Sequence, residues 1–231
     1  MKMNDYFELF HPTRGNVPNH IGLIPDGSRR WAKSRGISYF ESYEIAMAKL
    51  SQILDFLYGK GVGTVSIYFS SSQNFDRPKE EIEAFCKAES NFCSHYILPS
   101  VQKNKIKVDY CGNAQLVPGY LLDSLEELKS KTMEMIGKRL NICVAYNPFD
   151  ELWQSFNSSD SPEEFLHSLW VPDPLDLVIR TGKANLISNF LPLQSGFARL
   201  YFPDKMINDL TLDDIAEILN DFSELNRKYG E

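Results

Sequence analysis

The sequence has little cysteine, and the cysteines it has are not arranged as ligands. There are four in 231 residues, with no Cys-x-x-Cys pair and no histidines at ligand spacing. This pattern argues against a zinc site and against a disulfide framework. We expect free thiols in a reducing cytoplasm at Cys86, Cys93, Cys111 and Cys143.

Positive charge is also scarce. Lysine and arginine number 24 against 31 aspartates and glutamates, so the formal net charge is −7. Duplex nucleic acid is not an expected partner, because no strongly basic domain or tail is present to neutralise a run of phosphates. The positive charge that exists lies in short clusters, and this distribution indicates a small anionic ligand.

Long hydrophobic runs are absent as well. No apolar stretch reaches the roughly 18 residues that a transmembrane helix needs. The first 20 residues are too acidic and too interrupted for a signal peptide. We therefore expect a cytoplasmic protein with a polar N-terminal arm over residues 1–19 and a single domain over residues 20–231.

What the sequence does contain is an alternation of short apolar segments with amphipathic ones. Strands are predicted at 20–24, 64–70, 105–111, 139–146, 176–180 and 198–202. Helices are predicted over 42–58, from Pro78 to about 102 with Asp76 as cap, over 118–137 and over 211–228. Residues 147–175 are expected to form loops around a short helix. The alternation predicts an α/β fold whose central, mostly parallel six-stranded sheet is flanked by helices.

Polar clusters follow three of the predicted strands. They run from Asp26 to Arg30, from Ser70 to Arg77 and from Arg180 to Ser188. In parallel sheets ligands bind beyond the carboxyl ends of the strands, so the three clusters are expected to meet at one site. Helical residues such as Phe85 and Phe92 would wall an apolar cleft behind it, although each such residue is more often plain core.

The first cluster has the chemistry of a phosphate site. Free backbone N–H groups at a strand-to-helix turn can point at an anion, Gly27 allows close approach, and Arg30 offers a forked donor. Asp26 is explained if it holds a divalent metal that bridges to the phosphate. The alternative is an aspartate helix cap with solvated arginines.

The other two clusters strengthen the phosphate interpretation. Asn74 and Arg77 belong to the second cluster, which could otherwise be an ordinary polar turn. The third contains Arg180, Lys183 and Ser188, of which Lys183 could equally be a solvated loop residue. Together the clusters predict a pocket for phosphate or diphosphate with one candidate metal carboxylate.

Several motifs resemble the cis-prenyltransferase family, whose familiar member is undecaprenyl diphosphate synthase. The resemblance lies in "HIGLIPDGSRRWAKSRG", "IYFSSSQNFDRPKEE", "LNICVAYN", "LDLVIRTGKANLISNFLPLQ", "ARLYFPD" and the closing "NRKYG". It implies a homodimer with a central parallel sheet and a hydrophobic tunnel between sheet and helices. It also implies Mg²⁺ as the metal and an allylic prenyl diphosphate (dimethylallyl, geranyl or farnesyl) as the substrate.

The resemblance also implies roles for individual residues. Asp26 would be the essential carboxylate acting with Mg²⁺, and Asn74 would lie near the reacting carbons. Arg180 and Ser188 would belong to the second site, where the family binds isopentenyl diphosphate. The allylic diphosphate would be held by Gly27, Ser28, Arg29, Arg30 and Arg77.

Five positions depart from the family's pattern and suggest an altered second site. Residues that are usually Arg, His, Glu, Arg and a metal-binding Glu are here Tyr39, Tyr43, Gln73, Leu186 and Arg199. An arginine in place of a metal-binding carboxylate would repel Mg²⁺ bound beside it, unless its side chain turns away. The stretches "PDGSRRW", "ESYEIAM" and "FLPL" further resemble lavandulyl-type diphosphate synthases.

These features favour a prenyltransferase or terpene-forming enzyme of isoprenoid biosynthesis. It would ionise an allylic diphosphate and carry out an irregular reaction: head-to-middle coupling, cyclisation or elimination, or transfer to an unusual acceptor. A terpene synthase-type lyase falls within that group. The alternatives are a regular short- or medium-chain cis-prenyl diphosphate synthase that adds isopentenyl diphosphate, and a non-catalytic subunit of a heteromeric enzyme.

Overall fold

A single parallel sheet organises the computed structural model, which describes residues 15–224. The six strands lie in the order β3-β4-β2-β1-β5-β6, and every neighbouring pair is parallel. Their bounds are β1 His20–Ile24, β2 Thr64–Tyr68, β3 Ile106–Cys111, β4 Lys138–Cys143, β5 Leu177–Arg180 and β6 Arg199–Tyr201. The predicted α/β fold with six parallel strands is confirmed.

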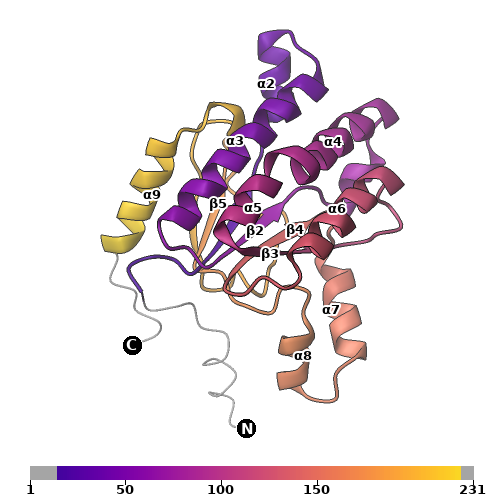
Figure 1. Ribbon diagram of the computed structural model, residues 1–231, viewed down its shortest axis with the longest axis vertical. Helices are drawn as coiled ribbons and strands as arrows, with labels where there is room; N and C mark the ends of the chain where they lie inside the picture. Colours follow the sequence, from indigo (N-terminus) through magenta and orange to yellow (C-terminus); the bar gives the residue numbers. More distant parts are fainter. Residues whose placement is uncertain (1–14, 225–231) are drawn as a thin grey trace.

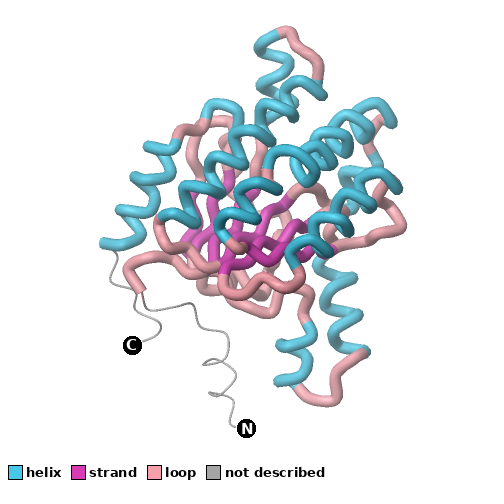
Figure 2. The backbone as a smooth tube through the Cα atoms, in the orientation of Figure 1, coloured by secondary structure: helices cyan, strands magenta, loops and turns pink. Residues whose placement is uncertain are grey.

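Helices cover one face of this sheet as a continuous layer, while α7 and α8 project beyond its lower edge (Figures 1 and 2). The helices are α2 Ser28–Arg35, α3 Tyr39–Gly59, α4 Lys79–Asn91, α5 Leu98–Asn104, α6 Gly119–Thr132, α7 Pro148–Asn157, α8 Pro162–Ser168 and α9 Leu212–Glu224. Shorter turns are the 3-10 helices η1 Ser72–Asp76 and η3 Ile207–Asp209 and the π-helical turn η2 Phe92–Tyr96.

The apolar stripe predicted for the long central helix α3 faces the sheet. Its stripe of Ala46, Leu50, Ile53, Leu54 and Leu57 is buried against the sheet, as the spacing requires. Its start lies a little earlier than predicted, because the Ser38 side chain accepts a hydrogen bond from the Glu41 N–H and caps the first turn.

A smaller apolar cluster covers the opposite face of the sheet. Val178 of β5 and Tyr68 of β2 pack there against Phe190 and Leu191, which belong to the segment between β5 and β6. Tyr68 stacks on Phe190 with ring centroids 4.8 Å apart. The segment after β5 is therefore fixed beside the carboxyl end of β2.

Several predicted elements were wrong in detail. The helix from Pro78 to about 102 is interrupted by the π-helical turn and restarts as α5, where Pro99 in the first turn cannot donate a backbone hydrogen bond. Asp76 does not cap it, because Asp76 ends η1 and Pro78 occupies the N-cap position. The predicted helix over 118–137 ends at Thr132.

Two regions are more helical than predicted. Residues 28–35 form α2, which begins at the predicted strand-to-helix turn; its range was not predicted, because the segment is mostly polar and, of its side chains, only Ser28 and Ala32 are buried. Residues 147–175 contain two helices, whose caps Asn147 and Ser161 were readable signals. The end of the predicted last helix, the motif "NRKYG" and most of the N-terminal arm lie outside the described residues.

The four cysteines are free, as predicted. Within residues 15–224, no helix is long and apolar enough to cross a membrane.

Candidate active site

A cavity of about 490 Å³ opens at the carboxyl ends of β1, β2 and β5, beneath helices α2, α3 and α4. Of the fourteen predicted site residues, ten line it: Asp26, Gly27, Ser28, Arg29, Arg30, Tyr43, Asn74, Arg77, Arg180 and Ser188. The other lining residues are Ile24, Pro25, Lys33, Ala46, Met47, Leu50, Tyr68, Phe69, Ser70, Ser71, Phe85 and Glu89. The three polar clusters of the sequence therefore meet, as the topology predicts.

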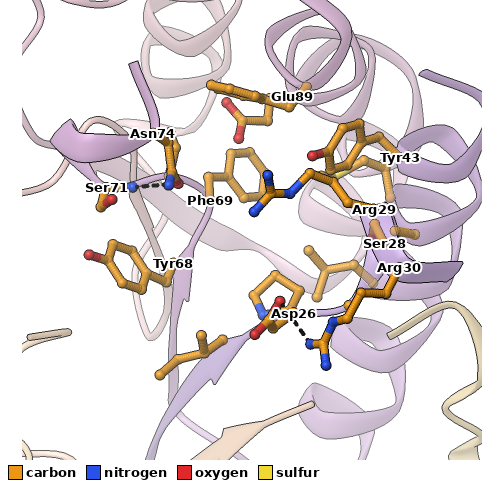
Figure 3. A pocket seen from close by; sticks show the side chains of 18 of the residues that line it. Asp26, Ser28, Arg29, Arg30, Tyr43, Tyr68, Phe69, Ser71, Asn74 and Glu89 are labelled. Carbon is orange, nitrogen blue, oxygen red and sulfur yellow. Dashed lines mark hydrogen bonds and ion pairs between the residues drawn. The ribbon is translucent and has the colours of Figure 1, made fainter. Parts of the chain in front are cut away.

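Asp26 lies at the mouth of the cavity between two arginines. Its Oδ2 atom is 3.0 Å from Nη2 of Arg180. Its Oδ1 atom is 3.5 Å from Nη2 of Arg30 (Figure 3). Its backbone is fixed by Thr181, whose hydroxyl accepts from the Asp26 N–H and donates to the Asp26 carbonyl. The carboxylate is thus held in place while its side chain remains 34% exposed to the cavity mouth.

Gly27 is required at the turn that follows. Its φ is 112°, which L side chains rarely adopt, and an added Cβ would lie 2.7 Å from the Met206 side chain. Gly27 is the N-cap of α2, and no side chain among residues 15–224 caps this helix. The first N–H groups of α2 therefore remain available to an anion in the cavity.

A second close approach brings Gly182 against the same turn. An added Cβ at Gly182 would lie 2.6 Å from Nη2 of Arg30 and 3.1 Å from the Asp26 carbonyl. The loop after β5 is thereby packed directly on the turn after β1. This contact explains how residues about 150 positions apart form one anion site.

Glu81 organises two further cations. Its Oε1 atom lies 2.9 Å from Nη1 of Arg29 and 3.2 Å from Nη1 of Arg77. The Glu81 side chain is only 10% exposed. Because one buried carboxylate orients two guanidinium groups from different elements, Arg29 and Arg77 are pre-positioned for a bidentate contact with an anion.

The turn after β2 presents small polar groups. Asn74 accepts a hydrogen bond from the Ser71 N–H at 3.1 Å, which closes a capping box at the start of η1 (Figure 3). The Asn74 side chain is thus partly engaged in holding the turn, in line with the ordinary polar turn that the sequence left open, and it still lines the cavity.

The third cluster is organised by Arg180, the last residue of β5. Arg180 is paired in register with Ile24 of β1, and this register places it beside Asp26. Its Nη1 atom donates to Ser188 Oγ at 2.6 Å and to the Leu186 carbonyl at 2.8 Å. Arg180 therefore ties the loop after β5 to the carboxylate at the cavity mouth.

Behind the charged mouth the wall is apolar. It is formed by side chains of α3 and α4 with Phe69 of the segment after β2: Ala46, Met47, Leu50, Phe69 and Phe85. Among the core residues suggested by the sequence as walls, Phe85 does line the cavity, whereas Phe92 is fully buried elsewhere in the core. Tyr43 packs edge-on against Phe85, and burial raises the pKa of its phenol to about 12.

Four predicted second-site residues do not line the cavity. Tyr39 opens α3, Gln73 is exposed on η1, and the Leu186 side chain is 55% exposed. Arg199 starts the edge strand β6, where its guanidinium lies 4.0 Å from the Asp221 carboxylate of α9 and stacks near Tyr201. Within this chain Arg199 therefore turns away from Asp26, and the expected repulsion of a metal at Asp26 does not arise from it.

The residues around Asp26 suit a metal ion that takes most of its ligands from substrate phosphates and water. Among residues 15–224, no group of three or more His, Cys, Asp or Glu side chains lies together as a metal site. Mg²⁺ is commonly bound through one or two carboxylates plus substrate phosphates and water. The single exposed carboxylate of Asp26 beside an anion site fits that mode.

Lys33 and Glu89 line the cavity but were not predicted as site residues. Lys33 adds a fifth cation to Arg29, Arg30, Arg77 and Arg180. The position of Glu89 in the sequence indicates its burial, because Glu89 follows Phe85 by four residues and so lies on the same buried side of α4. A carboxylate on an apolar stripe is the signal that was missed.

The comparisons with known proteins agree with this architecture. A family model described as "Putative undecaprenyl diphosphate synthase" matches residues 24–230. A tritrans,polycis-undecaprenyl-diphosphate synthase (geranylgeranyl-diphosphate specific) of Pyrococcus abyssi is 30% identical, covering 94% of this chain and 88% of its own. An isoprenyl transferase of Treponema denticola is 29% identical, covering 91% of this chain and 96% of its own.

Two solved structures share the fold. Lavandulyl diphosphate synthase from Lavandula x intermedia, in complex with dimethylallyl diphosphate, has a TM-score of 0.87 at 24% identity over 94% of this chain and 99% of its own. A probable undecaprenyl diphosphate synthase from Campylobacter jejuni has a TM-score of 0.75 at 22% identity over 92% and 98%. The chain belongs to the undecaprenyl diphosphate synthase family of cis-prenyltransferases, enzymes that transfer prenyl groups.

Proposed function

We propose that this enzyme ionises a short allylic prenyl diphosphate and directs the resulting cation into an irregular coupling, cyclisation or elimination, or to an unusual acceptor. The observation that carries the proposal is the division of the cavity. Five cations and Asp26 lie at its mouth, and an apolar wall lies behind them. A diphosphate with a hydrocarbon tail is the ligand that matches both ends.

The size of the cavity supports a short substrate. About 490 Å³ lies within the range of about 300–1,000 Å³ that suits ligands of drug size. A dimethylallyl or geranyl diphosphate is a ligand of that size, whereas a chain of many isoprene units is much larger.

The residues of the mouth would stabilise the leaving group. As the allylic C–O bond breaks, its electron pair departs with the diphosphate, and negative charge grows on the diphosphate oxygens. Arg29, Arg77 and the start of α2 all line the cavity, so their N–H groups would be the donors to that charge. Such pre-positioned donors stabilise a developing charge more than water does. Asp26 would hold Mg²⁺, which neutralises diphosphate charge when bound.

The experiment is a product assay. The purified protein is incubated with Mg²⁺ and dimethylallyl, geranyl or farnesyl diphosphate, each with and without isopentenyl diphosphate. Products are identified by mass spectrometry, and diphosphate release is measured. Products that form without isopentenyl diphosphate support the proposal, whereas products that require it and grow by five carbons contradict the irregular reaction.

A regular short- or medium-chain cis-prenyl diphosphate synthase is the second candidate. Two observations favour it: Arg180 and Ser188 line the same cavity as Asp26, and Arg199 turns away from the site. The names of the relatives also describe chain-elongating enzymes. In the product assay this candidate predicts longer chains on addition of isopentenyl diphosphate. A non-catalytic subunit predicts no turnover with any substrate.

We also propose a homodimer. On α7 the side chains of Phe149, Trp153 and Phe156 are 71%, 67% and 64% exposed, and the last two stack on each other. These positions share one face of the helix at spacings of four and three residues. Large exposed apolar faces of this kind mark contact surfaces between proteins. The edge strand β6 also exposes Leu200.

A further inference from the structure

Two thiols lie in contact at the ends of neighbouring strands, and neither lines the cavity. Cys111 is the last residue of β3 and Cys143 is the last residue of β4, and the two are paired in register across the parallel strands. The Cys111 Sγ atom donates to the Cys143 Sγ atom at 3.3 Å. The chemistry proposed above uses neither thiol.

A metal ion does not account for this pair. Structural zinc takes four ligands. Within residues 15–224, no group of three or more His, Cys, Asp or Glu side chains lies together as a metal site. Two thiols in contact on adjacent strands are instead the arrangement from which a disulfide can form, because the spacing of adjacent strands lies within the reach of a disulfide between their Cα atoms.

The two thiols differ in their access to solvent. Cys143 is fully buried, whereas Cys111 is half-buried. Burial, together with the hydrogen bond from Cys111, raises the pKa of the Cys143 thiol well above its usual value. Cys143 therefore stays protonated, and Cys111 is the thiol that a small oxidant reaches first.

We propose that Cys111 and Cys143 form a site of reversible oxidation whose co-reactant is hydrogen peroxide. The Cys111 sulfur attacks one peroxide oxygen, the O–O bond breaks, and one water departs, which leaves a sulfenic acid on Cys111. The Cys143 sulfur then attacks the Cys111 sulfur, the S–O bond breaks, and a second water departs with the Cys143 proton. Two thiols are thereby oxidised to one disulfide, and the peroxide is reduced to two waters.

The resulting disulfide is strained, and the strain makes it reversible. A relaxed bridge holds its two Cβ atoms about 3.8 Å apart, whereas adjacent strands lie about 4.7–4.9 Å apart. The ends of β3 and β4 must therefore approach each other by up to about 1 Å. Strained disulfides are reduced more easily than relaxed ones, so a dithiol should restore the two thiols.

Movement at Cys143 reaches the cavity through the backbone. The Cys143 carbonyl accepts hydrogen bonds from the N–H groups of Phe69 and Ser70, at 2.9 and 3.3 Å. Phe69 and Ser70 both line the cavity. Because close-packed interiors transmit displacement, the oxidised protein should hold an allylic diphosphate less tightly. This effect on binding, unlike the oxidation itself, rests on the function proposed above.

Peptide mapping by mass spectrometry tests the oxidation. The protein is treated with hydrogen peroxide, its remaining thiols are alkylated under denaturing conditions, and its peptides are mapped before and after addition of dithiothreitol. We expect two peptides linked through Cys111 and Cys143, separated by dithiothreitol, with Cys86 and Cys93 still alkylated. Absence of this link, or equally frequent links to Cys86 or Cys93, would overturn the inference.

Three variants assign the two steps. Cys111→Ser removes the half-buried thiol and should leave Cys143 alkylated after peroxide treatment. Cys143→Ala should retain a sulfenic acid at Cys111 that dimedone labels. Cys93→Ala, which changes another buried cysteine, is the matched control and should form the link as wild type does. If Cys143→Ala does not fold, as judged by circular dichroism, dimedone labelling of Cys111 in wild type at early times replaces it.

Calorimetry tests the effect on the cavity. Kd for dimethylallyl diphosphate is measured in EDTA, which suppresses turnover, for reduced wild type, oxidised wild type and peroxide-treated Cys111→Ser. We expect oxidised wild type to bind about 3- to 10-fold more weakly than reduced wild type. The treated variant, whose methionines meet the same peroxide, should bind like reduced wild type.

The outcomes of the two experiments are distinguishable. Equal affinities of reduced and oxidised wild type would overturn the connection between the thiol pair and the cavity. If reduced wild type does not bind dimethylallyl diphosphate, the proposed function fails and the effect on binding fails with it. The linked peptides still decide whether Cys111 and Cys143 are a site of oxidation.

Discussion

The Nη2 atom of Arg180 lies 3.0 Å from the Oδ2 atom of Asp26 and so joins the end of β5 to the turn after β1. Arg180 is nearly buried, with 11% of its side chain exposed, and Asp26 opens onto the cavity. The pair fixes a carboxylate at an anion site without neutralising the other cations around it. Its removal is the most direct test of the proposed chemistry.

Asp26→Asn keeps the shape of the side chain and removes its charge. We expect the rate of diphosphate release from the allylic substrate to fall by about 10²–10³-fold, the range typical of losing a group that acts on developing charge. Asp204→Asn makes the same change at an exposed position and should leave the rate unchanged. A rate for Asp26→Asn within threefold of wild type would contradict the proposed role of the carboxylate.

Glu81→Gln should weaken diphosphate binding. The neutral amide no longer attracts Arg29 and Arg77, so both guanidinium groups lose their fixed orientation. We expect Kd for dimethylallyl diphosphate to rise by about tenfold, since charge-assisted hydrogen bonds contribute about 1.5–3 kcal/mol and only part of this is lost. Glu80→Gln, at an exposed position next in sequence, is the control. Tighter binding by Glu81→Gln would show that Glu81 competes with the ligand for the arginines.

His20 should make the protein sensitive to acid. It is buried at the start of β1, bonded to Ser66 Oγ and the Pro174 carbonyl, and burial lowers its pKa to about 4. The unfolded chain takes up a proton near pH 6.5, whereas the folded protein does not do so until about pH 4. The free energy of unfolding should therefore fall by up to about 3 kcal/mol as the pH drops through this window.

Urea denaturation of wild type and His20→Gln between pH 7 and pH 4 measures this effect. The variant is expected to be less stable at pH 7, because its hydrogen bonds differ, and to lose less stability on acidification. His167→Gln changes an exposed histidine and should retain the wild-type pH dependence. Parallel pH dependences for His20→Gln and wild type would rule out His20 as the source.

Glu89 should produce the opposite dependence. Its pKa is raised well above the usual value, so the folded protein keeps a proton that the unfolded chain releases above about pH 4.5. Stability is therefore lost as the pH rises, by at most about 1.4 kcal/mol per pH unit until the carboxyl of the folded protein ionises. Glu89→Gln removes this loss. The melting temperature of Glu89→Gln relative to wild type should rise between pH 5 and pH 8, and Glu83→Gln should show no such trend.

Trp153→Glu should disrupt the proposed homodimer. A charge at the centre of the exposed face of α7 cannot be buried against a partner without a large desolvation penalty. Light scattering coupled to gel filtration should show a dimer for wild type and a monomer for the variant. The exposed substitution Lys129→Glu on α6 is the control. A wild-type monomer at micromolar concentration would contradict the proposal.

Much of the fold was predictable from local sequence. The strands are indicated by short apolar or β-branched runs, and β1, β2 and β5 are buried at every position. The principal helices are indicated by an apolar repeat of about 3.6 residues, because one face of each is buried. The extent of the polar helix α2 was not predictable, because only two of its side chains are buried. The interruption before α5 coincides with Pro99, which lies in the first turn of α5 and lacks the N–H that a continuous helix would use there.

The sequence predicted the part of the candidate site that directly follows the strands. The sequence alone determined that Asp26, Arg77 and Arg180 follow three strands of one parallel sheet, so their convergence follows from topology. Tertiary structure decided the rest. Glu81 bridges two arginines, Arg199 faces α9 rather than the cavity, and Glu89 turns a carboxyl into an apolar wall. Such orientations depend on the packing of separate elements against one another, and the spacing of residues along the chain does not encode them.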